Sequence, residues 1–276
     1  MATILTSQFG VREDTLFVVF DIEAFGDVNS PEKCRMWNLA ACVLGTPSEY
    51  IDLYIHPAIE EIPKWGENDF CNITEGELEA LGATSLRCCI RQFMSWVNKK
   101  KQNPDTTIIL CSHGCFRYDK ILLENEFMRN GLNFQPNIYF LDTLHWTRQV
   151  IRGRGSYALS DIYKDVFNQP LQNAHRAYGD TIALNRVISC LINVGHMLNG
   201  VMYPPFHTPI VRIPGIGICS ERMLVNKKVH SVEELHVMYD RMFARNAGSF
   251  VHYLCQLGLP SDSSQCVLQY LIENFF

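Results

Sequence analysis

The first apolar run of the chain reads Leu16-Phe17-Val18-Val19-Phe20 and continues directly into Asp21-Ile22-Glu23. A continuous run of this composition is typical of a central strand that is buried on both faces. Side chains alternate between the faces of a strand, so Asp21 and Glu23 are expected to point to the same side at its end. Two like charges held there repel each other and lose solvation, and a bound cation is the simplest way to stabilise them. The alternative is a strand that ends earlier and leaves both acids in solvent.

The segments that follow this strand alternate in type. We expect strands over residues 36–44, 50–55, 107–111 and 138–141, and helices after Thr74, after Ser85 and over 118–129, 143–150, 158–167 and 179–194. This order predicts an α/β fold, a mixed sheet with helices packed on it. No uninterrupted apolar run reaches the ~18–20 residues that a membrane-spanning helix needs, so we expect no membrane segment.

A group of prolines and glycines near residue 200 divides the chain. Asn199-Gly200 is followed by Pro204-Pro205 and Pro209, and the residues beyond read as mostly helical. We therefore predict a first domain over residues 1–200 and a small, mostly helical domain over residues 201–276.

The composition is that of a folded protein with an acidic excess. Of 276 residues, 47 % are hydrophobic and 19 % are charged, which provides a core and excludes wholesale disorder. The 24 Lys and Arg residues against 29 Asp and Glu give a formal charge of −5. Nucleic-acid-binding proteins normally carry a basic surface, so this charge is an objection that any such assignment must answer.

The cysteines and the start of the chain predict a reducing compartment. The 11 cysteines include no C-x-x-C pair and no zinc-finger spacing, so free buried thiols are expected. Residues 1–14 have neither a basic head nor an apolar signal core. We expect a nuclear or cytoplasmic protein that is not secreted.

Two further acids, Asp119 and Asp180, lie at the starts of predicted helices. Each leads the apolar stripe of its helix and should face the sheet instead of solvent. Either could also be an ordinary first-turn acid favoured by the helix dipole. Three separate elements that each direct an acid inward favour a site for hard divalent cations, with Mg²⁺ the default. Two such ions are a known solution for phosphodiester cleavage.

Such a site also needs a base to activate water. His175 lies five residues before Asp180, in a polar stretch that leads into the helix. A neutral imidazole beside the metals would suit proton abstraction from a bound water. His113, which follows the predicted strand 107–111, is the rival candidate.

Three ordered motifs resemble the DEDDh family of 3′→5′ exonucleases, which have an RNase H-like fold. Asp21-Ile22-Glu23-Ala24-Phe25-Gly26 resembles the first motif, Ser112 to Asp119 followed by Ile121-Leu122-Leu123 the second, and His175-Arg176-Ala177-Tyr178-Gly179-Asp180 the third. The kinship is strongest with the TREX type (three-prime repair exonucleases) and covers about residues 15–195. The exonuclease-like segment of the promyelocytic leukaemia protein family is a related possibility.

The resemblance implies an RNase H-like mixed sheet flanked by helices, and roles for individual residues. Asp21, Glu23, Asp119 and Asp180 would hold two Mg²⁺ ions, with Mn²⁺ as a substitute, and His175 would activate the water. The terminal nucleotide would contact Ala24, Phe25, Gly26 and Tyr118. TREX-type enzymes pair through an edge strand, so the resemblance also allows a homodimer.

The sequence departs from the family pattern at two places. Phe25 stands where the family usually has Thr, and its ring could stack on a base or wedge the last pair, or could instead narrow the pocket. His113-Gly114-Cys115 replaces the usual His-Asn-Gly.

The second predicted domain contains Ile213-Pro214-Gly215-Ile216-Gly217, which resembles the hairpin of a helix-hairpin-helix unit. In such units the hairpin glycines, here Gly215 and Gly217, offer backbone N–H groups to a DNA phosphate, and Lys227 and Lys228 could add charge. Glu221 stands where a small residue is common and would strain close helix packing. The alternative is a helical packing or dimerisation domain built on a Pro-Gly turn.

Together these observations predict a metal-dependent 3′→5′ exonuclease that removes nucleotides from single-stranded DNA ends. The alternatives are an RNA 3′-end trimming exonuclease and a non-catalytic nucleic-acid-binding module on the same fold. The acidity then stops being an objection, since four of the acids are assigned to two divalent ions. The metal-loaded chain would carry −5 + 4 = −1.

Overall fold

The computed structural model describes residues 14–26, 30–56, 73–172, 174–196, 198, 200 and 202–275. Residues 1–13, on which most of the prediction of a non-secreted protein depends, lie outside this set. The chain divides into two compact units, Met1–Met202 and Tyr203–Phe276. This division falls two residues from the predicted boundary. Within the described residues, no helix has the length and apolar character needed to span a bilayer.

The first unit is built on a mixed sheet with the strand order β3-β2-β1-β4-β5-β6. β1 pairs with β2 antiparallel and with β4 parallel, β2 pairs with β3 antiparallel, and β4 pairs with β5 parallel. The strands are β1 (Thr15–Phe25), β2 (Arg35–Val43), β3 (Thr46–Tyr54), β4 (Thr107–Ser112), β5 (Ile138–Asp142) and β6 (Met202–Tyr203).

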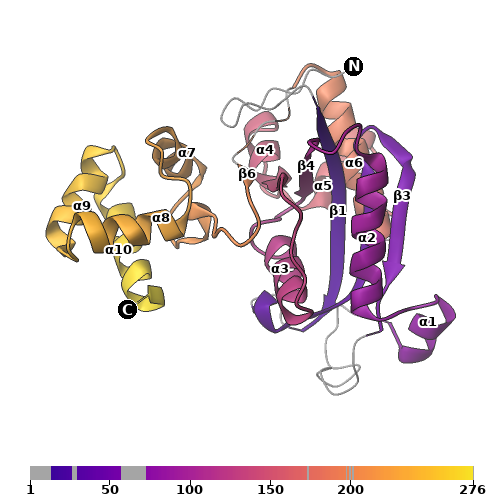
Figure 1. Ribbon diagram of the computed structural model, residues 1–276. Coiled ribbons are helices and arrows are strands. Elements are labelled where there is room, and N and C mark those ends of the chain that lie inside the picture. Colours follow the sequence, from indigo (N-terminus) through magenta and orange to yellow (C-terminus); the bar gives the residue numbers. More distant parts are fainter. Residues whose placement is uncertain are drawn as a thin grey trace. The chain divides into compact units, whose positions relative to one another are not determined.

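Helices cover both faces of this sheet. The helices are α1 (Glu75–Ala80), α2 (Leu86–Lys100), α3 (Asp119–Arg129), α4 (Thr143–Val150), α5 (Leu159–Phe167) and α6 (Ala177–Asn193), with a 3₁₀ turn η1 (Pro31–Lys33). In Figure 1, α2 crosses in front of the sheet and α6 lies behind it. The predicted mixed α/β architecture is therefore confirmed, with each expected strand and helix within a few residues of its predicted bounds.

Local sequence explains where these helices begin. Thr74 caps α1 with a capping box completed by Glu77, and the Ser85 hydroxyl accepts from the Cys88 N–H at the start of α2. Such caps satisfy N–H groups that have no partner within the helix. The apolar stripe of α2 then buries Cys89, Ile90, Phe93 and Val97.

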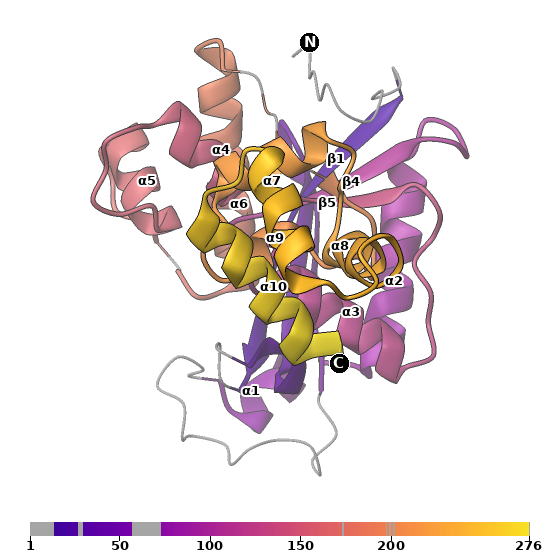
Figure 2. The same ribbon diagram turned by 90° about the vertical axis from the view of Figure 1, so that its left-hand side faces the viewer.

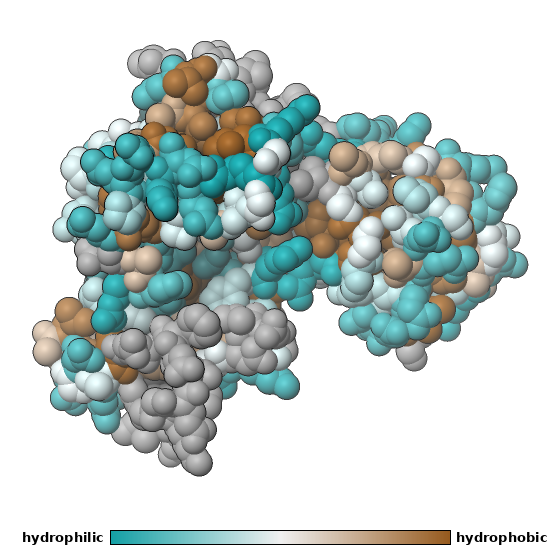
Figure 3. Space-filling model, turned by 180° about the vertical axis from the view of Figure 1, so that it is seen from behind, coloured by the Kyte–Doolittle hydropathy of each residue, from teal (hydrophilic) through white to brown (hydrophobic). Residues whose placement is uncertain are grey.

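The core lies on both sides of the central strands. On the face covered by α6, Val19 of β1 and Cys42 of β2 belong to one buried hydrophobic cluster. The helix contributes Ala183, Leu184, Val187, Ile188 and Leu191 to it. Seen from behind, the surface of the first unit is mostly hydrophilic with smaller hydrophobic patches (Figure 3). The strands that carry the acids are thus fixed by packing on both faces.

The second unit is helical, as predicted. It consists of η3 (Ile210–Arg212), α7 (Ile218–Asn226), α8 (Val232–Val237), the π-helical turn η4 (Met238–Met242), α9 (Ala247–Gln256) and α10 (Ser261–Phe275) (Figure 2). The expected helix before the Gly215 hairpin is only the three-residue turn η3. The physical reason is the pair Pro209 and Pro214, since a proline disfavours helical geometry at the residue before it.

Candidate metal centre and active site

β1 brings the first two predicted ligands to one face of the sheet. The strand continues through both acids, and Asp21 pairs with Ala40 and Glu23 with Asn38 of β2. The register shifts only after Glu23, so the alternation of faces holds across both residues. The alternative in which the strand ends before the two acids is therefore wrong.

Asp119 is the first residue of α3 and is only 4 % exposed. The Ser112 hydroxyl, at the end of β4, donates to Asp119 Oδ2 at 2.8 Å. One carboxylate oxygen is thus held by a neighbouring strand, and the orientation of the side chain is fixed before any ligand arrives.

Asp180 lies in the first turn of α6. The backbone N–H of His175 donates to Asp180 Oδ2 at 2.9 Å, and His175 itself adopts a left-handed backbone, with φ of 63°. The start of the helix is tied to the sheet because the Ala177 N–H donates to Asn38 Oδ1 at 3.1 Å. Asn38 also donates to Asp52 Oδ1 at 2.8 Å, so one amide joins β2, β3 and α6.

These elements bring the four predicted carboxylates together. Oxygen atoms of Asp21, Glu23 and Asp180 all lie within 4.8 Å of one another. Asp119 interacts electrostatically with both Asp21 and Glu23. Acids from β1, α3 and α6 therefore share one site, although they are up to 159 residues apart in sequence (180 − 21).

The pKa values of all four carboxyls are raised, because burial disfavours their charged forms. Burial, followed by repulsion from Asp119, Glu23 and Asp180, holds the pKa of Asp21 well above its usual range. Burial, Asp180 and Asp119 raise the pKa of Glu23 to about 8. Burial also raises the pKa of Asp119 to about 7 although the Ser112 hydrogen bond lowers it, and burial raises that of Asp180.

This donor set fits divalent metal ions. The cluster offers carboxylate oxygens alone, which are the preferred ligands of hard cations such as Mg²⁺ and Mn²⁺. Repulsion by the other acids helps to raise the pKa values of Asp21 and Glu23, and a cation between the carboxylates would relieve it. A second group of metal-ligating type, His56, Glu75 and Glu79, lies beside α1, with two of its three side chains exposed.

The two candidate bases have different surroundings. His175 is exposed next to Asp180. His113 is tied at both ring nitrogens, with Nδ1 3.3 Å from Thr143 Oγ1 and Nε2 2.7 Å from the Tyr157 carbonyl. Burial lowers the pKa of His113. The position of His113 suits a structural tie between β4, α4 and the following loop.

Asp142, which sequence reasoning did not single out, fixes the loop that leads to Asp119. Its carboxylate accepts from the backbone N–H groups of Gly114, Phe116 and Leu144, at 2.9, 3.2 and 2.9 Å. Two of these bonds hold the turn between β4 and α3 against the end of β5, and the third caps the start of α4. Gly114, which departs from the usual His-Asn-Gly pattern, adopts a φ of 85° in this turn.

The residues predicted to meet the terminal nucleotide lie at the end of β1 and before α3. Ala24 is buried, and Phe25 is 6 % exposed with its ring 6.2 Å from that of Trp37. Gly26 has a φ of 124°, and a Cβ there would lie 2.8 Å from Cys34 Sγ, so only glycine fits. Tyr118 is half-buried at the start of α3. Stacking of Phe25 on a base would require its ring to leave Trp37.

In the second unit, the predicted hairpin has the required turn. Gly215 has a φ of 80°, and a Cβ there would lie 3.1 Å from Cys266 Sγ, whereas Gly217 precedes α7. Lys227 and Lys228 are exposed at the end of α7. Glu221 does not strain the packing as expected, because it is accommodated as a buried acceptor for the Tyr203 hydroxyl at 2.5 Å.

Several side chains around the cluster had no role assigned from the sequence. Arg176 lies with its guanidinium 5.4 Å from the Trp37 ring and lowers the pKa of Glu23 against the effect of burial. The exposed rings of Tyr178 and Tyr50 contact each other, with centroids 4.7 Å apart. The only available signal was the position of Arg176 and Tyr178 inside the third motif. In the loop after α4, Arg154 pairs with Asp165 of α5.

Comparisons with known proteins match this fold to exonuclease structures. No family model and no curated protein matches the sequence. The nuclease domain of 3′hExo, a DEDDh family member bound to rAMP, has a TM-score of 0.54 at 15 % identity, over 66 % of this chain and 94 % of that one. A zinc-bound E. coli ExoI–ssDNA complex has a TM-score of 0.53 at 22 % identity, over 66 % of this chain and 41 % of that one.

The same enzyme, E. coli exonuclease I, in complex with a dA16 oligonucleotide gives a TM-score of 0.52 at 20 % identity, over 65 % of this chain. The matched region is 41 % of the length of exonuclease I. These likenesses confirm the predicted RNase H-like exonuclease fold, a mixed sheet flanked by helices. The structural neighbours are exonucleases, and 3′hExo is described as a DEDDh family member, whereas the TREX-type kinship of this chain stays a prediction.

Proposed function

We propose that this protein is a divalent-metal-dependent 3′→5′ exonuclease that removes nucleotides from single-stranded DNA ends. The observation that carries the proposal is the meeting of Asp21, Glu23, Asp119 and Asp180 from three elements in one partly buried cluster. The fold shared with solved exonucleases supports the same assignment.

The metal ligands would be these four carboxylates. When bound, Mg²⁺ or Mn²⁺ ions at such a site lower the pKa of a coordinated water and stabilise negative charge on the phosphate. Asp21 and Glu23 are held on the central strand, and Asp119 is oriented by Ser112. The protein therefore keeps its donor atoms in place at little conformational cost, which favours binding.

The base would be His175. Its side chain is exposed, its backbone N–H donates to Asp180, and it interacts electrostatically with that carboxylate, which supports a place for the imidazole near a water at the acids. It would accept the proton of that water as the phosphodiester is attacked. The rival His113 is engaged at both ring nitrogens, which leaves none for proton transfer.

The substrate end would lie along Ala24, Gly26 and Tyr118. The burial of Phe25 against Trp37 favours a role in narrowing the pocket over a role in stacking on a base. The exposed pair Tyr50 and Tyr178 offers aromatic faces to bases beyond the end.

The second unit would contribute a phosphate contact. The N–H groups of Gly215 and Gly217, with the exposed Lys227 and Lys228, offer the chemistry that such a contact needs, whereas the Ile216 N–H already donates to the Ile213 carbonyl at 3.1 Å. The short η3 turn in place of a full first helix leaves the packing or dimerisation role as the competing assignment. β3 lies at an edge of the sheet, which is compatible with a homodimer.

Labelled DNA and RNA oligonucleotides incubated with Mg²⁺ test the proposal. We expect stepwise shortening from the 3′ end of single-stranded DNA, and loss of activity in Asp21→Asn and in His175→Ala. Faster shortening of RNA would favour the RNA-trimming alternative. Binding without cleavage by well-folded wild type, or full activity in Asp21→Asn, would favour the non-catalytic binding module.

A further inference from the structure

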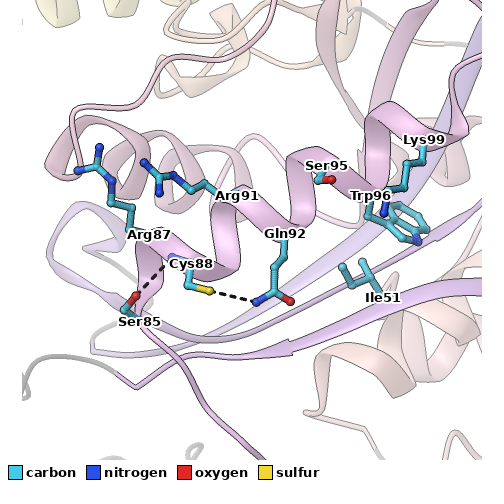
Figure 4. Close-up of a pocket in the computed structure, with 9 residues that line it drawn as sticks. All are labelled: Ile51, Ser85, Arg87, Cys88, Arg91, Gln92, Ser95, Trp96 and Lys99. Carbon is cyan, nitrogen blue, oxygen red and sulfur yellow. Dashed lines mark hydrogen bonds between the residues drawn. The ribbon is translucent and has the colours of Figure 1, made fainter.

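An open groove of about 530 Å³ lies between α2 and the edge strand β3, outside the carboxylate cluster. Figure 4 shows its lining, which consists of Ile51, Ser85, Arg87, Cys88, Arg91, Gln92, Ser95, Trp96 and Lys99. Its charged side chains are all cations, Arg87, Arg91 and Lys99. We propose that this groove binds the phosphate backbone of single-stranded nucleic acid.

The three cations have no compensating acid among the described residues. None of Arg87, Arg91 and Lys99 takes part in an ion pair or side-chain hydrogen bond there, and all three are exposed. The two acids of β3 have other partners, since Glu49 pairs with Lys100 at 2.8 Å and Asp52 accepts from Asn38. In a chain of net charge −5, three adjacent unpaired cations are a local departure that favours an anionic partner.

The placement of these cations is unfavourable for the helix itself. Arg87 lies in the first turn of α2, where the helix dipole disfavours positive charge and where the helix has no acid. Arg87 and Arg91 are four residues apart and point the same way from the helix (Figure 4), so they repel each other. Both costs are relieved when an anion lies along the helix.

The dimensions fit a polymer better than a small anion. Arg87, Arg91, Ser95 and Lys99 recur every four residues and form one stripe along α2. Twelve residues of helix span about 18 Å, which is about the length of five nucleotides at ~3.4 Å each. Beside this stripe, Trp96 offers an aromatic face, and Ser85 and Gln92 offer polar groups. A single strand, with phosphates and unpaired bases, matches both kinds of lining.

The groove lies on the sheet face opposite the acids. Asp21 pairs with Ala40, and Ala40 with Asp52, so these three share one face, whereas Ile51 in the groove points to the other. α6 packs on the first face and α2 on the second (Figure 1). The groove would therefore hold a part of the strand several nucleotides away from the end at the carboxylates. The inference rests on the proposed nuclease function, because that function supplies the polyanion.

The test measures, by fluorescence anisotropy, the binding of a labelled single-stranded oligonucleotide of about thirty nucleotides. It is done in EDTA, where no hydrolysis is expected. We expect Arg91→Glu to weaken binding at least about fivefold. For a triple Arg87→Gln/Arg91→Gln/Lys99→Gln variant, we expect the plot of log affinity against log salt concentration to be less steep, by the amount that the loss of about two phosphate contacts predicts. The matched control is Lys164→Glu, an exposed helix cation on α5 outside the groove. Circular dichroism would verify that all variants fold.

Three results would overturn the inference. They are equal affinities of Arg91→Glu and Lys164→Glu, an unchanged salt dependence in the triple variant, or no wild-type binding in EDTA. A fourth result would also overturn it. If the triple variant lost binding to an acidic polypeptide that wild type binds, and kept the oligonucleotide affinity of wild type, the groove would be assigned to a protein partner. The proposed nuclease function is read separately, from wild-type hydrolysis with Mg²⁺ of an oligonucleotide of about four nucleotides, which is too short to reach both sites.

Discussion

Replacing Glu23 by Gln keeps the shape of the side chain and removes one negative charge from the cluster. In the folded protein without metal, burial, Asp180 and Asp119 raise the pKa of Glu23 from 4.5 to about 8. The unfolded chain has no such environment, so its pKa stays near 4.5. Between these two pH values the folded wild type holds a proton that the unfolded chain has lost. Stability must therefore fall as pH rises through this window.

The size of the effect follows from the displacement of this pKa. At ~1.4 kcal/mol per pH unit, the full loss would be about 2 kcal/mol at pH 6 and on the order of 5 kcal/mol at pH 8. Glu23 is partly exposed, and solvent screening reduces these values by roughly half. We expect Glu23→Gln to be more stable than wild type by about 1 kcal/mol at pH 6 and about 2 kcal/mol at pH 8, with no difference near pH 4.5.

Urea denaturation in EDTA at several pH values measures this difference. Asp105→Asn, at an exposed acid in the loop before β4, is the control and should follow wild type at every pH. Saturating Mg²⁺ should reverse the order, since ligand at 100 times Kd stabilises wild type by about 2.7 kcal/mol. Wild-type stability in EDTA that rises from pH 5 to pH 8, or a Gln variant no more stable than the control, would refute the reasoning.

Three other substitutions separate catalysis, ligand positioning and packing. His175→Ala should lower kcat by about 10²–10⁴-fold in Mg²⁺ assays while thermal melts still show stabilisation by the metal; loss of that stabilisation would instead mean a structural role. Ser112→Ala should weaken Mg²⁺ binding by about 10–100-fold in calorimetry, because Asp119 loses the hydroxyl that orients it; unaltered binding would contradict this. Glu221→Ala should cost about 1–3 kcal/mol of unfolding free energy because the buried Tyr203 hydroxyl loses its acceptor. Glu221→Gln, which keeps an acceptor, should cost less, and equal losses would argue against the hydrogen bond.

Periodicity in the sequence was sufficient to locate the elements that carry the acids. The apolar run before Asp21 predicts the central strand, and the stripes that follow Asp119 and Asp180 predict the helices α3 and α6. These signals are local, since burial of one face dictates the spacing of apolar residues. The acids lie together because of the order of the strands in the sheet. No local pattern in the sequence indicates that order.

The roles of the side chains that hold the acids could not be predicted from the sequence, although Ser112 opens the second motif. Ser112 and Asp142 act through hydrogen bonds to groups that are 7 and 28 residues away. No periodicity marks a hydroxyl or carboxylate that accepts or donates across elements. The tail shows the opposite case, because Pro209 and Pro214 are visible in the sequence and explain why the first helix of the hairpin unit is only a three-residue turn.

The buried amide of Asn38 has a consequence for how the site tolerates change. It accepts from the first residue of α6, Ala177, and donates to Asp52 and to the Leu53 carbonyl of β3. Its own residue is the strand partner of Glu23. One neutral side chain thus fixes the spacing between Glu23 on the sheet and Asp180 on the helix. A substitution of Asn38 would keep all four acids in the sequence and would remove the hydrogen bonds that align two of them.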